Sequence, residues 1–220
     1  MSVLEARAIR YEIGGRTILS GLDVIVGPGE RVAIVGPSGS GKTSLLALLA
    51  GLAASTSGEI SVDGRPVRPG EVPAGVATVL QGHGLVSLLT AAENVEIALL
   101  AVGLPPGEVP AATRDALAQV GLAEHADQLA DELSGGQQQR VAVARAVAVR
   151  PAVLIADEPT AEQDRASREL VLTAMLDIPS RGGSLVLATH DPDVARRCDR
   201  VIDLSSGQGA QAGTTGLVPR

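Results

Sequence analysis

The segment GPSGSGKT, residues 36–43, constrains the fold of this 220-residue chain more than any other stretch. It follows the apolar run RVAIVG at 31–36, which predicts a buried strand, and it precedes a helical pattern from about Gly41 to Ala53. Glycines let the backbone curl so that several N–H groups point inward, and a helix start adds partial positive charge. A strand, a glycine-rich loop and a helix in this order predict a phosphate-binding loop in an α/β domain.

The loop satisfies the pattern G-x-x-x-x-G-K-[ST], the P-loop of nucleotide-binding proteins. Lys42 is predicted to reach the β- and γ-phosphates, and the Thr43 hydroxyl to bind Mg²⁺. Lys42 is the only lysine in the chain, beside 17 arginines. The other residues expected around the phosphates are Gly36, Pro37, Ser38, Gly39, Ser40, Gly41 and Ser44.

A second apolar run, VLIADEP at 153–159, ends in two carboxylates. Asp157 is predicted to hold Mg²⁺, directly or through water. Glu158 lies one residue further toward the γ-phosphate, where a carboxylate can act as the general base for an attacking water.

Two more polar residues end apolar runs, Gln81 after GVATVL and His190 after SLVLAT. The carboxyl ends of parallel strands meet at the edge where open α/β folds bind ligands, so both are predicted to lie beside the P-loop. His190 is expected to bond the γ-phosphate and orient the water, and Gln81 to contact Mg²⁺ or the water. His83 and His125 lack this setting and are interpreted as surface residues.

Strand-like and helical runs alternate before residue 88 and after residue 150, which favours a largely parallel sheet. The nucleotide-binding core is therefore assigned to 1–87 and 151–211, and a helical insertion to 88–150. Early strands are expected at 3–9 and 22–26, and a hairpin at 60–67. Further strands are expected at 75–81, 153–157, 184–189 and 200–204, and helices at 93–102, 113–121, 136–149 and 164–178.

Composition excludes several classes of protein. A net charge of −7 and a pI near 5.0 argue against a nucleic-acid partner. The single cysteine, Cys198, excludes an internal disulfide and is expected to be an unused, buried or half-buried thiol. The N-terminus does not resemble a signal peptide, and the longest apolar run, at 45–54, is well short of the ~20 residues that span a bilayer. The end of the chain, 212–220, contains LVPR and is interpreted as a tag or linker remnant.

The stretch LSGGQQQR, residues 133–140, predicts a second anion-binding helix start. Ser134 is a good N-cap, and Gly135 and Gly136 leave backbone N–H groups accessible. The chain has no second lysine with which to complete another P-loop. This helix also belongs to the insertion, so it need not face the P-loop of its own chain.

Together GPSGSGKT, Gln81, LSGGQQQR, VLIADEP and His190 resemble, in order and spacing, the ATP-binding-cassette (ABC) ATPases over about residues 3–205. The resemblance implies an α/β fold: a P-loop NTPase core with a mostly parallel sheet, an N-terminal antiparallel β part and an inserted all-α signature subdomain. It implies ATP and Mg²⁺ as cofactors. Tyr11, whose setting alone allows either edge packing or base stacking, resembles the adenine-stacking tyrosine of this family.

The resemblance also implies a second copy of the chain as partner. Two copies would close head to tail around two ATP molecules, each completing the partner's site with Ser134, Gly135, Gly136, Gln137 and Asp164. A separate membrane-spanning permease would dock near 81–92, which implies a cytoplasmic protein held at the inner face of the membrane.

Finer features resemble the lipoprotein-release and macrolide-export branch, namely LVSLLTAAENV at 85–95 and ADQLADELSGGQQQRVAVARA at 126–146. The cell-division branch, whose ATPase drives a non-transporting membrane complex that signals to an extracytoplasmic enzyme, is the alternative. A GTPase is excluded because its N-K-x-D motif needs a second lysine. Two residues depart from the family pattern: Gln163 stands where an apolar residue is usual, and Ser87 where this branch commonly has proline.

Overall fold

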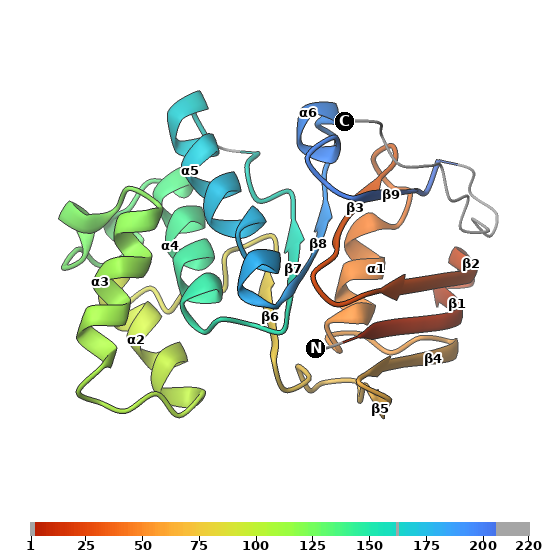
Figure 1. Cartoon of the computed structure of the whole chain (residues 1–220). Helices are drawn as coiled ribbons and strands as arrows, with labels where there is room; N and C mark the ends of the chain where they lie inside the picture. The colour runs from red at the N-terminus through yellow and green to blue at the C-terminus, as the bar shows by residue number, and fades with distance from the viewer. Residues whose placement is uncertain (1–2, 162, 206–220) are drawn as a thin grey trace.

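The computed structural model describes residues 3–161 and 163–205, which form two sheets (Figure 1). The first sheet is antiparallel with the order β2-β1-β4-β5. Its strands are β1 (Leu4–Ile13), β2 (Arg16–Val26), β4 (Ser57–Val62) and β5 (Arg65–Pro66). The second sheet is parallel throughout with the order β6-β7-β8-β3-β9. Its strands are β3 (Arg31–Val35), β6 (Val76–Val79), β7 (Val153–Asp157), β8 (Ser184–Ala188) and β9 (Arg200–Asp203).

Helix α1 (Lys42–Leu49) follows the P-loop and lies between the two sheets (Figure 1). Its four buried leucines join one apolar core with residues of the antiparallel sheet and of β3, β7 and β8. Every residue of β7 and β8 is buried, as expected for central parallel strands with both faces covered. This packing fixes the start of α1 relative to the ends of the parallel strands.

The chain between β6 and β7 is helical and lies on the side away from the antiparallel sheet (Figure 1). It contains α2 (Ala91–Ala101), α3 (Val109–Gln119), α4 (Gly135–Ala148) and the short 3₁₀ helices Ala123–His125 and Ala130–Glu132. Helix α5 (Arg165–Leu176), the 3₁₀ helix Pro179–Arg181 and α6 (Pro192–Ala195) follow β7 and β8. The predicted fold class is confirmed: a mostly parallel α/β core, an antiparallel N-terminal part and an inserted helical part.

The N-terminal strands are longer than predicted. They form one hairpin in which Ile13 pairs with Arg16 across Gly14 and Gly15, both with positive φ. Two such residues make the tight turn that suits a two-residue hairpin, a signal that the apolar pattern alone does not carry. The predicted hairpin around Asp63 and Gly64 is confirmed by the pairing of β4 with β5.

Other expectations concern single residues. Cys198 is buried, as predicted. Within the described ranges, none of the helices is both long enough and apolar enough to cross a membrane. The interpretation of 212–220 as a tag remnant falls outside the described residues.

Asn94 organises the loop that leads into α2. The side chain is buried, and its Oδ1 accepts a hydrogen bond from Val86 N at 2.8 Å. Its Nδ2 donates to the carbonyls of Val86, Leu89 and Thr90. Thr90 also caps the helix in a reciprocal capping box with Glu93. The Asn94 amide thus bonds three backbone positions of the segment 86–90.

Replacing Asn94 with Ala should destabilise the protein by about 2–3 kcal/mol, because buried backbone groups lose their partners. Urea unfolding followed by circular dichroism measures the change. Ile97→Ala, at an exposed position of the same helix, is the control and should stay within about 0.5 kcal/mol of wild type. Equal stabilities for the two variants would contradict this role of Asn94.

Candidate active site

The predicted site residues meet at the carboxyl edge of the parallel sheet. The P-loop follows β3, Asp157 ends β7, and His190 and Gln81 each follow the end of a strand, β8 and β6, by two residues. These four strands are neighbours in the order β6-β7-β8-β3. Parallel pairing therefore brings residues more than 100 positions apart to one line along the sheet.

The lysine of the P-loop is hydrogen-bonded to the first residues of the same loop. Lys42 Nζ donates to Gly36 O at 2.8 Å and to Pro37 O at 3.2 Å, so the ammonium lies at the mouth of the loop. A side chain at Gly41 would meet Leu19 Cδ2 at 2.9 Å and Ile18 Cγ2 at 3.1 Å, so β2 packs directly on the loop. Tyr11 is half-buried on β1 and pairs with Leu19. The tyrosine is thus one strand away from the P-loop.

Asp157 is a buried carboxylate, 2% exposed. Neither of its oxygens has a hydrogen-bond partner among the described residues. Burial raises the pKa of Asp157, as does the Glu158 charge, whereas the Thr43 hydroxyl and the Lys42 charge lower it. A buried carboxylate without donors, next to a hydroxyl, fits a site for a hard cation such as Mg²⁺. The described residues contain no cluster of three or more His, Cys, Asp or Glu, so phosphate oxygens and water would complete the coordination.

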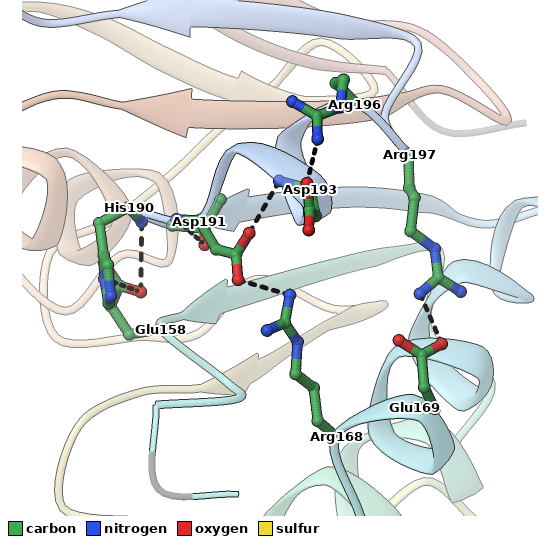
Figure 2. A network of polar contacts seen from close by, with 9 residues as sticks. Glu158, Arg168, Glu169, His190, Asp191, Asp193, Arg196 and Arg197 are labelled. Atoms are coloured by element: carbon green, nitrogen blue, oxygen red, sulfur yellow. Dashed lines mark hydrogen bonds and ion pairs between the residues drawn. The ribbon is translucent and has the colours of Figure 1, made fainter. Parts of the chain in front are cut away.

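Glu158 and His190 form a pair (Figure 2). Glu158 Oε2 lies 2.9 Å from His190 Nδ1 and 3.4 Å from His190 N. The Glu158 side chain is 17% exposed and that of His190 is 73% exposed, so the imidazole lies on the solvent side of the carboxylate. Glu158 has a φ of +45°, a left-handed conformation uncommon for a residue with a side chain.

The remaining predicted residues lie apart from this edge. Ser134 caps α4 in a reciprocal capping box with Gln137, and both Ser134 and Gly135 are exposed. Asp164 caps α5 through Ala166 N and Ser167 N. In the described part of the chain, no hydrogen bond or ion pair joins 134–137 or Asp164 to the P-loop.

Comparison with known proteins decides the family. Residues 19–161 match the ABC transporter family. The chain belongs to this family. It is 41% identical over 201 residues to the lipoprotein-releasing system ATP-binding protein LolD 1 of Rhodospirillum rubrum, covering 87% of this chain and 88% of the relative. It is 42% identical over 219 residues to the uncharacterized ABC transporter ATP-binding protein YbbA of Escherichia coli K12, covering 94% and 96%.

Solved structures agree with this assignment. The dimeric ATP-binding cassette MJ0796, in a post-hydrolysis state bound to ADP and Pi, matches with a TM-score of 0.84 and 30% identity. The match covers 94% of this chain and 97% of that one. The predicted resemblance is confirmed: the chain is an ATP-binding ABC transporter subunit with ATPase activity.

Sequence reasoning missed the support behind the Glu158–His190 pair of this ABC ATPase. Asp191 caps α6 through Asp193 N, and its other oxygen pairs with Arg168 Nη2 at 2.5 Å (Figure 2). Arg168 belongs to the first turns of α5. The Asp-Pro step at 191–192 signals a helix start, but nothing in the sequence identifies an arginine 23 residues earlier as its partner.

The two other histidines are less exposed than predicted. His83 and His125 are both half-buried, and His125 Nδ1 is buried without a hydrogen-bond partner among the described residues. The backbone carbonyl of His83 accepts a hydrogen bond from Arg145 Nη2 of α4 at 2.9 Å.

Asp157→Asn should stabilise the ligand-free protein. Folding raises the pKa of this carboxyl, so its ionisation costs stability at every pH above its ordinary pKa, and the cost vanishes as the carboxyl is protonated at low pH. We expect Tm at pH 7.5 to rise by about 2–4 °C for each 1 kcal/mol by which the free energy of unfolding increases. This rise in Tm should become smaller toward pH 4. Differential scanning calorimetry measures both.

Asp177→Asn is the matched control. The Ser180 hydroxyl and then Arg181 lower the pKa of Asp177, so its charge favours folding. This variant should leave Tm unchanged or lower it. A lower Tm for Asp157→Asn than for wild type would contradict the assignment of Asp157 as an unpaired buried charge.

Proposed function

We propose that this chain powers export or extraction of a substrate by a separate membrane permease, through a head-to-tail dimer that encloses two ATP molecules. One observation carries the proposal. The P-loop, Asp157, Glu158 and His190 meet at one sheet edge, whereas the LSGGQ turn at 133–137, with Ser134 and Gly135 exposed, lies in the helical part and makes no hydrogen bond or ion pair to the P-loop within the described residues. A second copy would bring its own turn onto this edge.

In this proposal the chain's own residues position ATP and activate water. The P-loop N–H groups and Lys42 bind the phosphates, and Tyr11 stacks on the adenine. Thr43, Asp157 and Gln81 would hold Mg²⁺, which when bound neutralises phosphate charge. Glu158 accepts a proton from the attacking water, while His190, paired with Glu158, orients that water toward the γ-phosphate. The partner's Ser134, Gly135, Gly136 and Gln137 would close over the same phosphate.

The loop 81–90 supports docking of a permease near 81–92. Val86 is 52% exposed and Leu88 is 79% exposed, on a segment whose backbone is hydrogen-bonded to the buried Asn94 amide. Arg145 of α4 donates to Gly84 O at 2.6 Å and to His83 O at 2.9 Å. A membrane partner seated on Val86 and Leu88 would therefore be linked to Gln81 on one side and to the signature helix on the other. Docking of this kind would hold the ATPase at the cytoplasmic face of the membrane.

Relatives of two kinds of transporter match this chain about equally well. LolD 1 of Caulobacter vibrioides, also a lipoprotein-releasing system protein, is 40% identical over 220 residues and covers 94% of this chain. The glutamine transport protein GlnQ of Escherichia coli is 39% identical over 218 residues. Because both kinds of transporter subunit match over the whole core, the branch rests on the loop 85–95 and the segment 126–146.

Glu158→Gln should stop turnover while keeping ATP binding. Removing a general base lowers kcat by about 10²–10⁴-fold, whereas the P-loop is untouched. With saturating ATP and Mg²⁺, the variant should elute as a dimer in size-exclusion chromatography with light scattering, and with ADP as a monomer. A variant that binds ATP yet stays monomeric would contradict the composite dimer.

Lys42→Ala should reduce ATP hydrolysis by weakening phosphate binding, a step before the activation of water by Glu158. It deletes the chain's only lysine and with it that positive charge at the phosphates, so we expect at least a 10²-fold loss of phosphate release. Fluorescent-nucleotide titration should show weaker binding as well. Wild-type activity in this variant would refute the P-loop assignment.

A further inference from the structure

Two glutamine amides join the loop after β7 to the start of the signature helix. Gln163 Nε2 donates to Gly136 O at 2.8 Å. Gln139 Nε2 donates to Glu158 O at 3.1 Å, and Gln139 is a buried residue, 6% exposed. The first bond runs from the loop to α4 and the second from α4 to the loop. Together they hold Glu158 and Gln163 against the first turns of α4.

The Gln139 bond supports an unusual backbone. Glu158 has a φ of +45°, and such a conformation persists only where the surroundings hold it. Glu158 N donates to Ala188 O at 3.0 Å, and Glu158 O accepts from Gln139. Both peptide groups around Glu158 are therefore fixed, one by β8 and one by α4. This fixes the direction in which the carboxylate leaves the chain, toward His190.

The Gln163 bond connects the loop after β7 to the LSGGQ turn of the same subunit. Gly136 belongs to the turn that, in the proposed dimer, serves the partner's ATP. Gln163 directly precedes Asp164, which caps α5 and which we expect at the same dimer interface. An apolar side chain, the usual type at this position in the family, could fill the space but could not donate to Gly136 O.

We propose that Gln163, together with Gln139, is a positioning residue that couples the two half-sites of one subunit. This inference rests on the proposed composite dimer. Glu158 acts on the ATP bound to the P-loop of its own subunit. The side-chain amides of Gln139 and Gln163 fix the position of the signature turn relative to Glu158. Each subunit therefore presents its turn to the partner's ATP in a geometry set by its own catalytic loop.

The test uses Gln163→Met, introduced into the full chain that already carries Glu158→Gln. Methionine has nearly the same length and lacks the donor, and an apolar residue suits this position. The measured quantities are the ATP concentration for half-maximal dimerisation, by light scattering, and the affinity of the monomer for ADP, by calorimetric titration. Gln163→Leu is a second variant that should behave alike.

We expect ADP affinity to stay unchanged, because the P-loop is intact. The ATP concentration for half-maximal dimerisation should rise at least about five-fold, the factor that corresponds to ~1 kcal/mol for one amide–carbonyl bond. Gln138→Met is the control: Gln138 lies on the same helix, but its amide donates to Leu133 O, five residues earlier, rather than to the loop after β7. Its dimerisation should stay within two-fold of the parent.

Two results would overturn the inference in different ways. A parent Glu158→Gln protein that never dimerises refutes the composite dimer and the coupling with it. A parent that dimerises, with both Gln163 variants folded and within two-fold of it, refutes the coupling alone and leaves the proposed function standing.

Discussion

The parallel pairing of β8 with both β3 and β7 is the constraint on which the site depends. Ala188 pairs with Ile34 on one side and with Asp157 on the other, so the strand ends are in register. All five residues of β8 are buried, with Leu185 and Leu187 in one apolar cluster and Val186 and Ala188 in the other, so the strand is packed on both faces. The positions of the P-loop, Asp157 and His190 follow from this single register.

The same packing buries an unpaired carboxylate at the site. Asp157 ends a strand whose residues are all buried, and its carboxylate has no donor within the described residues. A buried charge without partners costs stability, so the ligand-free core carries a cost that a cation and phosphates would offset. The left-handed backbone of Glu158, directly after it, adds to this cost. Strain and unpaired charge thus occur together where the proposed chemistry takes place.

The sequence predicts the centre of the fold better than its edges. β7 ends at Asp157 as predicted, because a carboxylate closes its apolar run, whereas β6 and β8 end before the predicted 81 and 189, so that Gln81 and His190 follow their strands by two residues at the sheet edge. The extent of β1 and β2 is missed because few of their residues are buried, so the apolar pattern breaks between 9 and 22, where the turn at Gly14 and Gly15 lies.

The hydrogen bonds that hold the loops of the site in place could not be predicted from the sequence, and the reason is a different one. Gln139, Gln163 and Arg145 all donate to backbone carbonyls, and a carbonyl is present at every position, so no residue type marks the acceptor. Only the tertiary arrangement selects it. The three contacts share one feature: each involves helix α4. The helix that carries the LSGGQ turn is thereby bonded to the loop after β6 and to the loop after β7, the two segments that hold Gln81 and Glu158. A helix held at both places cannot shift without moving these loops, which is the property that a subunit needs if its turn is to serve a partner's ATP.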